Sequence, residues 1–155
     1  MCEPWPTPFR FLPGNHDIGD NPPGPDHPAQ QPLQERVLQR FRVAFGPDYW
    51  GTAVSGWFVI GLNAQLFGSH SWLETEQYRW LGECVREAGK RPVALMLHKP
   101  LFQNTREDAA PHIRYVPLGP RRRLLNLLAG MNLRIVLSGH VHQYLDRIID
   151  GVRHI

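Results

Sequence analysis

Short apolar runs that alternate with amphipathic segments are the main pattern along this chain. The apolar runs lie between glycine, proline or polar residues and predict buried strands over residues 9–12, 57–62, 92–97 and 133–137. Between them, apolar residues recur at helical spacing, which predicts helices over about 32–45, 73–88 and 124–131. The tail is predicted to form a hairpin around Asp150-Gly151.

The alternation of strands and helices predicts an α/β fold with a parallel or mixed sheet. Side chains that can bind metal ions follow three of the predicted strands. Asn15 and His16 follow the first, His98 follows residues 92–97, and His140 follows residues 133–137. Open α/β sheets place their sites at the carboxyl ends of strands, so we expect these side chains to meet at one edge of the sheet.

The residue types at these strand ends are those that bind transition-metal ions. Asn15 offers an amide oxygen, while His98, His140 and His142 offer imidazole nitrogens, a combination that suits Mn, Fe, Zn, Ni or Co. His140 and His142 stand two residues apart. They point the same way in a regular strand, but in a turn they diverge and reach two metals.

His16 and Asp17 lie beside Asn15 and suit proton transfer. If His16 is not a ligand, it can donate a proton or a hydrogen bond to a leaving-group oxygen, with Asp17 orienting its imidazole. Each signal alone has a plain structural explanation, such as an Asn/Asp-rich turn or a core histidine. The combination favours a site because the segments stand in this order at predicted strand ends. The remaining histidines lack that context and are predicted to be surface residues: His27, His70, His112 and His154.

Composition bounds the remaining possibilities. The chain has 155 residues, of which 42% are hydrophobic and 20% charged, and residues 1–155 are predicted to form one globular domain. The net charge of +3 is mild, and Arg121-Arg122-Arg123 is better explained by a solvated helix face than by nucleic-acid binding. Cys2 and Cys84 form neither a disulfide framework nor a zinc-finger spacing, and Cys84 is expected to be buried. Neither a signal peptide nor a membrane span of ~18–20 apolar residues is seen, so a cytoplasmic location is the default expectation.

Three motifs in order resemble those of the calcineurin-like metallophosphoesterase superfamily, in particular its bacterial phosphodiesterase-like members. They are Gly14-Asn15-His16-Asp17, Leu97-His98-Lys99-Pro100 and Gly139-His140-Val141-His142. The segment from Phe45 to Trp50 and the helix with Trp80-Leu81 are also similar to those members. The resemblance spans nearly the whole chain. It implies part of an α/β/β/α sandwich with two divalent metal ions bridged by a carboxylate and a hydroxide.

The resemblance also implies a role for each candidate residue. One metal is expected to bind three residues: Asn15, His98 and His140. The second is expected to bind His142. His16 is expected to stabilise the transition state and protonate the leaving group, supported by Asp17. The implied activity is metal-dependent hydrolysis of a phosphodiester or monoester, with nucleic acid possible only as a substrate.

The chain departs from the family pattern at its start. The Asp-x-His and Gly-Asp motifs are absent, so the resemblance implies a carboxyl-terminal portion with the N-terminal strands missing and at most one metal well ligated. One alternative is a truncated, non-catalytic remnant that binds one metal and has a structural or protein-binding role. A nucleic-acid-binding module that uses Arg121–Arg123 ranks last, because nothing else in the sequence supports it.

Overall fold

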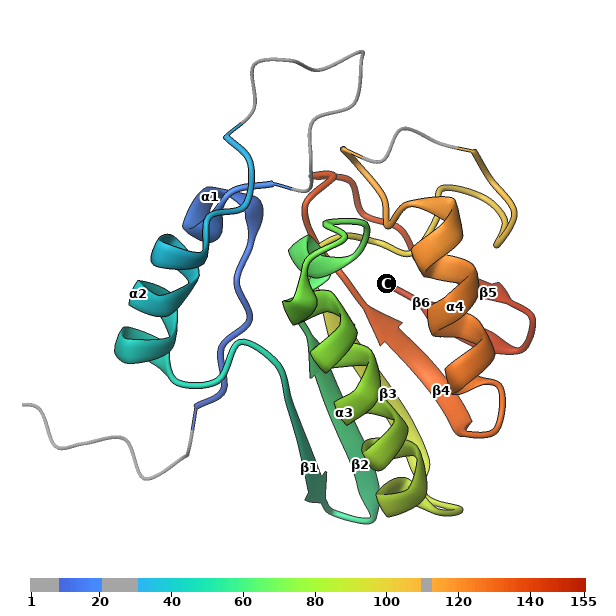
Figure 1. Cartoon of the computed structure of the whole chain (residues 1–155). Coiled ribbons are helices and arrows are strands. Elements are labelled where there is room, and N and C mark those ends of the chain that lie inside the picture. Colours follow the sequence, from blue (N-terminus) through green and yellow to red (C-terminus); the bar gives the residue numbers. More distant parts are fainter. Residues whose placement is uncertain (1–8, 21–30, 110–112) are drawn as a thin grey trace, which may run out of the picture.

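The computed structural model describes residues 9–20, 31–109 and 113–155. A six-stranded sheet lies at its centre, in the order β1-β2-β3-β4-β6-β5 (Figure 1). The strands are β1 (Trp50–Val54), β2 (Trp57–Leu62), β3 (Pro92–Leu97), β4 (Asn132–Leu137), β5 (Arg147–Ile149) and β6 (Val152–His154). Neighbours from β2 to β6 are parallel, whereas β1 and β5 pair antiparallel at the two edges.

Helices precede β1 and connect the parallel strands β2, β3 and β4, and some of their ends have recognisable capping residues. They are α1 (Asn15–Ile18), α2 (Glu35–Phe45), the 3-10 helix η1 (Ala64–Leu66), α3 (Trp72–Ala88) and α4 (Leu118–Leu128). The Ser71 hydroxyl accepts the Glu74 backbone N–H at 3.4 Å and caps α3. Gly46 follows α2 with a φ of 87°, a conformation that favours glycine. Within the described ranges, none of these helices combines the length and the apolar character that a bilayer span requires.

The main hydrophobic core lies between the sheet and α3 and α4, the helices that follow β2 and β3. Figure 1 shows α3 and α4 over the same face of the sheet. Strand alternation turns every second residue toward them, and register places Ile60, Leu95 and Val136 in one row across three strands. All three side chains are buried. Burial of each such side chain contributes about 1.5–3 kcal/mol, so this face provides much of the stability.

The opposite face of the sheet is also apolar but less covered. Val59, Ala94 and Ile135 form the adjacent row, and each is only partly buried. Met96 and Leu137 pair on the same face, closer to the carboxyl ends of β3 and β4, and are also only partly buried. One face therefore holds a core, while the other exposes part of its apolar surface.

A polar network and a smaller apolar cluster join α1 and α2 to the sheet. The cluster contains five buried side chains: Ile18, Leu38, Phe41, Leu66 and Leu73. Asp48 is buried and accepts hydrogen bonds from Arg42 Nε at 2.6 Å and from Asn63 Nδ2 at 2.8 Å. Because the carboxylate has two partners, its burial is compensated.

The predicted α/β class is confirmed, and the described residues form one sheet with its helix layer. The helices predicted over 32–45 and 73–88, the strands over 57–62, 92–97 and 133–137, and the hairpin around Asp150-Gly151 occur where they were predicted, within a few residues. A strand over residues 9–12 was wrong, because this segment pairs with no neighbour; instead the Phe11 carbonyl accepts the Trp50 indole N–H at 2.9 Å. The sequence analysis missed β1, and α4 begins at Leu118 rather than near Leu124. That residues 1–155 form a single partial domain stays a prediction.

Predictions on single side chains also have outcomes. Cys84 is buried, as expected. The prediction that His154 is a surface residue is wrong, because it lies half-buried with its ring 4.9 Å from that of Phe102. His70 is exposed as predicted, whereas His27, His112 and Cys2 lie outside the described residues.

Candidate metal centre

His98 and His140 come together because they follow neighbouring parallel strands. Register pairs Met96 of β3 with Leu137 of β4, and the Gly139 backbone N–H donates to the His98 carbonyl at 3.0 Å. The two imidazole rings lie 4.8 Å apart at 67°. His140 has a φ of 69°, a left-handed conformation that is uncommon for a residue other than glycine and that turns the chain away from the strand direction.

Asn15 reaches the same place from a single helical turn rather than from a strand, which corrects the prediction that Asn15 and His16 follow a strand end. Gly14 precedes this turn and lies against the His98 ring. A Cβ atom at Gly14 would lie 2.9 Å from His98 Cε1, so only glycine allows this approach. The glycine of the Gly14–Asp17 motif is therefore explained by the space that His98 occupies.

Three donor atoms form a closed triangle at this point. Asn15 Oδ1 lies 2.9 Å from His98 Nε2 and 3.2 Å from His140 Nδ1, and the two nitrogens are 3.0 Å apart. Ligands about 2.1 Å from a transition-metal ion, at right angles to one another, are themselves separated by about 3 Å. The triangle therefore has the spacing of three ligands on one side of a metal ion.

Protonation of the histidines supports the same interpretation. His140 Nε2 lies 2.7 Å from the Ile113 carbonyl, which can only accept, so Nε2 carries the hydrogen and Nδ1 offers a lone pair to the triangle. Burial lowers the pKa of His140, and burial together with the neighbouring His140 lowers the pKa of His98 to about 4. Both rings are thus neutral at pH 7. The lone pairs of Asn15 Oδ1 and His140 Nδ1 then face each other and repel. A cation bound between them would offset this repulsion.

The residues present fit a divalent metal through this donor set of one amide oxygen and two imidazole nitrogens. Within residues 9–20, 31–109 and 113–155, no group of three or more His, Cys, Asp or Glu side chains is placed to hold a metal ion. The third corner of the triangle is an asparagine.

The other predicted site residues lie around the triangle rather than in it. His16 is exposed beside Asn15, and Asp17 Oδ2 accepts the Gly14 backbone N–H at 2.7 Å. His142 is exposed with a φ of 55°, and its charge contributes to the lowered pKa of His140. The metal-binding roles of Asn15, His98, His140 and His142 stay predictions, as do the catalytic roles of His16 and Asp17.

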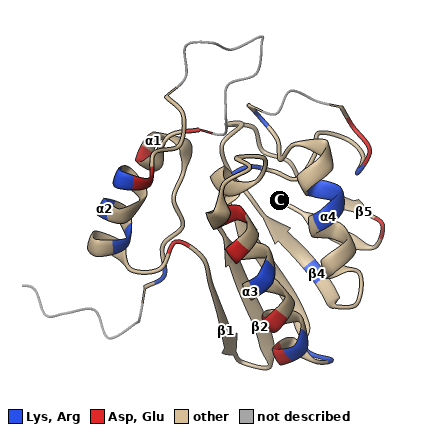
Figure 2. Cartoon of the chain, viewed as in Figure 1, with Lys and Arg blue, Asp and Glu red and all other residues tan. Residues whose placement is uncertain are grey.

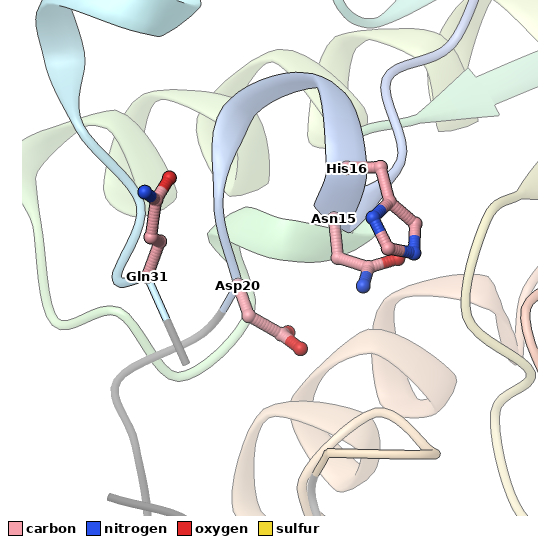
Figure 3. Close-up of a pocket in the computed structure, with 4 residues that line it drawn as sticks. All are labelled: Asn15, His16, Asp20 and Gln31. Atoms are coloured by element: carbon pink, nitrogen blue, oxygen red, sulfur yellow. The ribbon is translucent and has the colours of Figure 1, made fainter. Parts of the chain in front are cut away.

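A cavity of about 250 Å³ opens next to the Asn15 turn. Figure 3 shows its lining by Asn15, His16, Asp20 and Gln31. Asp20 is buried and forms an ion pair with Lys99, the residue after His98. The sequence analysis did not single out Asp20, Gln31 or Lys99. A charged residue directly after His98 at a predicted strand end was the available signal for Lys99.

The three consecutive arginines do not form an open basic surface. Arg121 is buried and donates to the Asp108 carbonyl, Arg122 pairs with the Glu107 carboxylate, and the Arg123 guanidinium lies 3.9 Å from the centre of the Tyr78 ring. Figure 2 shows basic residues spread over α2, α3 and α4 rather than gathered on one element. The described residues therefore give no support to a nucleic-acid-binding module built on these arginines.

Comparisons with known proteins agree with the motifs and the fold. A family model for calcineurin-like phosphoesterase matches residues 1–144. The chain is similar to the serine/threonine-protein phosphatase CPPED1 of Danio rerio, at 28% identity, and of Homo sapiens, at 25% identity. These alignments cover 94% and 93% of this chain but only 45% and 46% of the relatives, so the chain spans less than half of their length.

The fold is also similar to that of a solved structure, GAP50, the anchor in the inner membrane complex of Plasmodium. That comparison has a TM-score of 0.51 and 15% identity, and it covers 68% of this chain and 34% of the other. At this identity the likeness concerns the fold alone. With the family model matching nearly all of its residues, the chain belongs to the calcineurin-like phosphoesterase family.

Proposed function

We propose that this chain contributes one part of a metal-dependent site that hydrolyses phosphate esters. The support is family membership, the similarity to proteins named as serine/threonine phosphatases, and the donor triangle. That name favours a phosphomonoester as substrate, while the bacterial phosphodiesterase-like resemblance favours a diester, so both belong in the test. Members of the family generally use divalent metal ions.

In the proposal, one ion is held by Asn15, His98 and His140, and His142 contacts a second. A divalent ion in such a site polarises a phosphoryl oxygen and lowers the pKa of bound water. Other residues of the chain orient the metal-binding side chains. The Ile113 carbonyl fixes the His140 tautomer through the Nε2–H hydrogen bond, which keeps Nδ1 free to bind.

His16 is the proposed proton donor to the leaving-group oxygen. It lines the cavity beside Asn15 and is exposed, so a substrate in the cavity has access to its imidazole. Asp17 is proposed to support this role through its charge and by holding the turn, since its carboxylate accepts the N–H of Gly14. General acid catalysis of this kind typically contributes about 10²–10⁴-fold in rate.

The observation that carries the proposal is the mutual spacing of Asn15 Oδ1, His98 Nε2 and His140 Nδ1. It is tested by titrating the metal-free protein with Co²⁺, Mn²⁺ and Zn²⁺ in a calorimeter. We expect binding that His140→Ala removes and that His70→Ala, a change at an exposed histidine outside the triangle, leaves intact. Wild-type protein that binds none of these ions contradicts the proposal.

Hydrolysis is tested separately with p-nitrophenyl phosphate and bis(p-nitrophenyl) phosphate, as monoester and diester. If the chain turns over either compound, His16→Ala is expected to lower kcat by about 10²–10⁴-fold with less effect on metal affinity. The His70→Ala protein again serves as control. An unchanged kcat in His16→Ala refutes the role proposed for His16.

A second function is favoured by one specific observation. The described residues place three donors around one position, and none of these donors is a carboxylate, so this part of the chain offers one well-supported metal position. This suits a non-catalytic protein that binds one metal and has a structural or protein-binding role. It predicts one equivalent of bound metal and no turnover, and turnover of either ester favours the catalytic proposal instead.

A further inference from the structure

Lys99 and Asp20 form a fully buried ion pair beside the donor triangle. Lys99 directly follows His98 at the end of β3, and Asp20 lies shortly after α1, so the pair connects the sheet with the turn that carries Asn15. The exposed fractions are 0% for Lys99 and 3% for Asp20. The Nζ atom of Lys99 donates to Asp20 Oδ1.

Asp20 is also held by its backbone, which makes it a fixed point for the turn. Its N–H donates to the Gln31 carbonyl at 2.8 Å, and its carbonyl accepts the Leu33 N–H at 2.7 Å. Figure 3 shows the side chain of Asn15 extending from α1 and that of Asp20 from the segment directly after α1. A displacement of Asp20 therefore moves a short, connected segment that includes Asn15.

Stability alone is a poor explanation for such a pair. Removing two charges from water costs several kcal/mol per ion, and apolar replacement of a buried ion pair is often neutral or stabilising by about 1–4 kcal/mol. What an ion pair adds over apolar packing is a defined geometry between two particular atoms. Here the two atoms belong to Lys99, which follows the candidate ligand His98, and to Asp20, which follows the turn that carries the candidate ligand Asn15.

We propose that Lys99 is a positioning residue, whose ion pair with Asp20 holds the Asn15 turn so that Asn15 Oδ1 stays in contact with His98 Nε2 and His140 Nδ1. The inference rests on the proposed metal site for its functional meaning. Its structural part, the placement of Asn15 against His98, is a property of the metal-free protein.

The pair formed by Arg42 and Asp48 provides a matched control. Asp48 is as buried as Asp20, and its carboxylate is 2.6 Å from Arg42 Nε. This pair joins the end of α2 to Asn63 after β2, and the hydrogen-bond partners of Asp48 are Arg42 and Asn63. Its loss is expected to destabilise the fold without moving Asn15.

The experiment compares the wild-type chain with two double variants, Lys99→Met/Asp20→Leu and Arg42→Met/Asp48→Leu. Each removes both charges, so neither leaves a single buried charge that prevents folding. The first readout is the set of nuclear Overhauser effects between the Asn15 carboxamide protons and the His98 ring protons in metal-free protein. The second is Co²⁺ affinity by calorimetry, measured well below the thermal midpoint of each variant.

We expect the Lys99→Met/Asp20→Leu protein to fold, to lose the Asn15–His98 effects and to bind Co²⁺ about 10–100-fold more weakly, as is typical for residues that orient metal ligands. The control variant is expected to keep both properties. Persistence of the Asn15–His98 effects in the Lys99→Met/Asp20→Leu protein overturns the inference, as does an equal loss of affinity in the control. If wild-type protein shows the Asn15–His98 effects but binds no Co²⁺, the proposed function fails, while the comparison of these effects still decides whether the pair positions Asn15.

Discussion

The two halves of the candidate metal centre have different structural supports. His98 and His140 follow β3 and β4, which pair in register and carry the fully buried Leu95 and Val136 on the face covered by helices. Asn15 lies on a single helical turn that inserts one buried apolar side chain, Ile18, into a small cluster. Its other supports are polar: backbone hydrogen bonds to the segment before α2, and side-chain contacts with the ends of β3 and β4 that include the Lys99–Asp20 pair.

This difference determines what a mutation changes in each half. Loss of packing under β3 and β4 lowers the free energy of unfolding of the whole sheet, because the strands share one core. Loss of a polar contact at the turn changes the position of Asn15 before it changes the stability of the sheet. Stability and metal affinity should therefore respond separately to changes in the two regions.

The largest expected effect is a change in the core below β3. Leu95→Ala removes a fully buried side chain and is expected to lower the free energy of unfolding by about 2–5 kcal/mol, measured by urea denaturation. Met96→Ala changes the next residue, which points to the partly exposed face, and should cost clearly less. Equal losses for the two variants contradict the assignment of the core to one face.

Gly14→Ala changes the turn side of the comparison. A Cβ atom there meets the His98 ring at 2.9 Å, so the ring or the turn must shift; overpacking of this kind typically costs about 1–3 kcal/mol. We expect the variant to lose Co²⁺ affinity as well, because the shift separates Asn15 from His98. Gly82→Ala in α3, where an added Cβ meets nothing within 4 Å, should be neutral or stabilise the helix by up to about 1 kcal/mol. A Gly14→Ala protein with wild-type affinity shows that the close approach does not matter.

The pH dependence of the metal-free protein tests the burial of the triangle. Burial lowers the pKa of His98 from 6.5 to about 4, so between these values the unfolded chain binds a proton that the folded chain does not. Stability must therefore fall as the pH is lowered through this range, by roughly 2 kcal/mol between pH 7 and pH 5. His98→Gln, measured in parallel by urea denaturation with a chelator present, should show a smaller fall. The same slope in both proteins means that His98 does not titrate as the structure indicates.

The sequence allowed prediction of the parts of the site that follow from strand topology. His98 and His140 stand after apolar runs, and parallel neighbours bring such positions together, so their contact was predictable. Asn15 also contacts His98, but the sequence singled it out through the Gly14–Asp17 motif, since the strand expected before it does not form. A residue's neighbours along the chain do not reveal whether a partner strand exists.

Contacts between distant polar residues were beyond the sequence. The Lys99–Asp20 pair joins positions 79 residues apart, and no periodicity of apolar residues contains that information. β1 was missed because no apolar run marks it: three of its five residues are exposed, and it pairs with β2 at the edge of the sheet. Arg121 appeared to belong to a solvated face, yet it is buried.

The smallest expected effect is that of His142→Ala, which tests whether His142 is a ligand of the first metal ion. His142 is exposed and no hydrogen bond joins it to the triangle, so His142→Ala should leave the tighter Co²⁺ affinity within about twofold, or ~0.4 kcal/mol. His140→Ala, two residues away in the same loop, should abolish that binding, because it removes one corner of the triangle. Calorimetric titration of the two variants side by side separates the two histidines. A large loss in His142→Ala means that this loop rearranges to supply a fourth ligand, and then the left-handed conformations at His140 and His142 describe a loop that closes when metal binds.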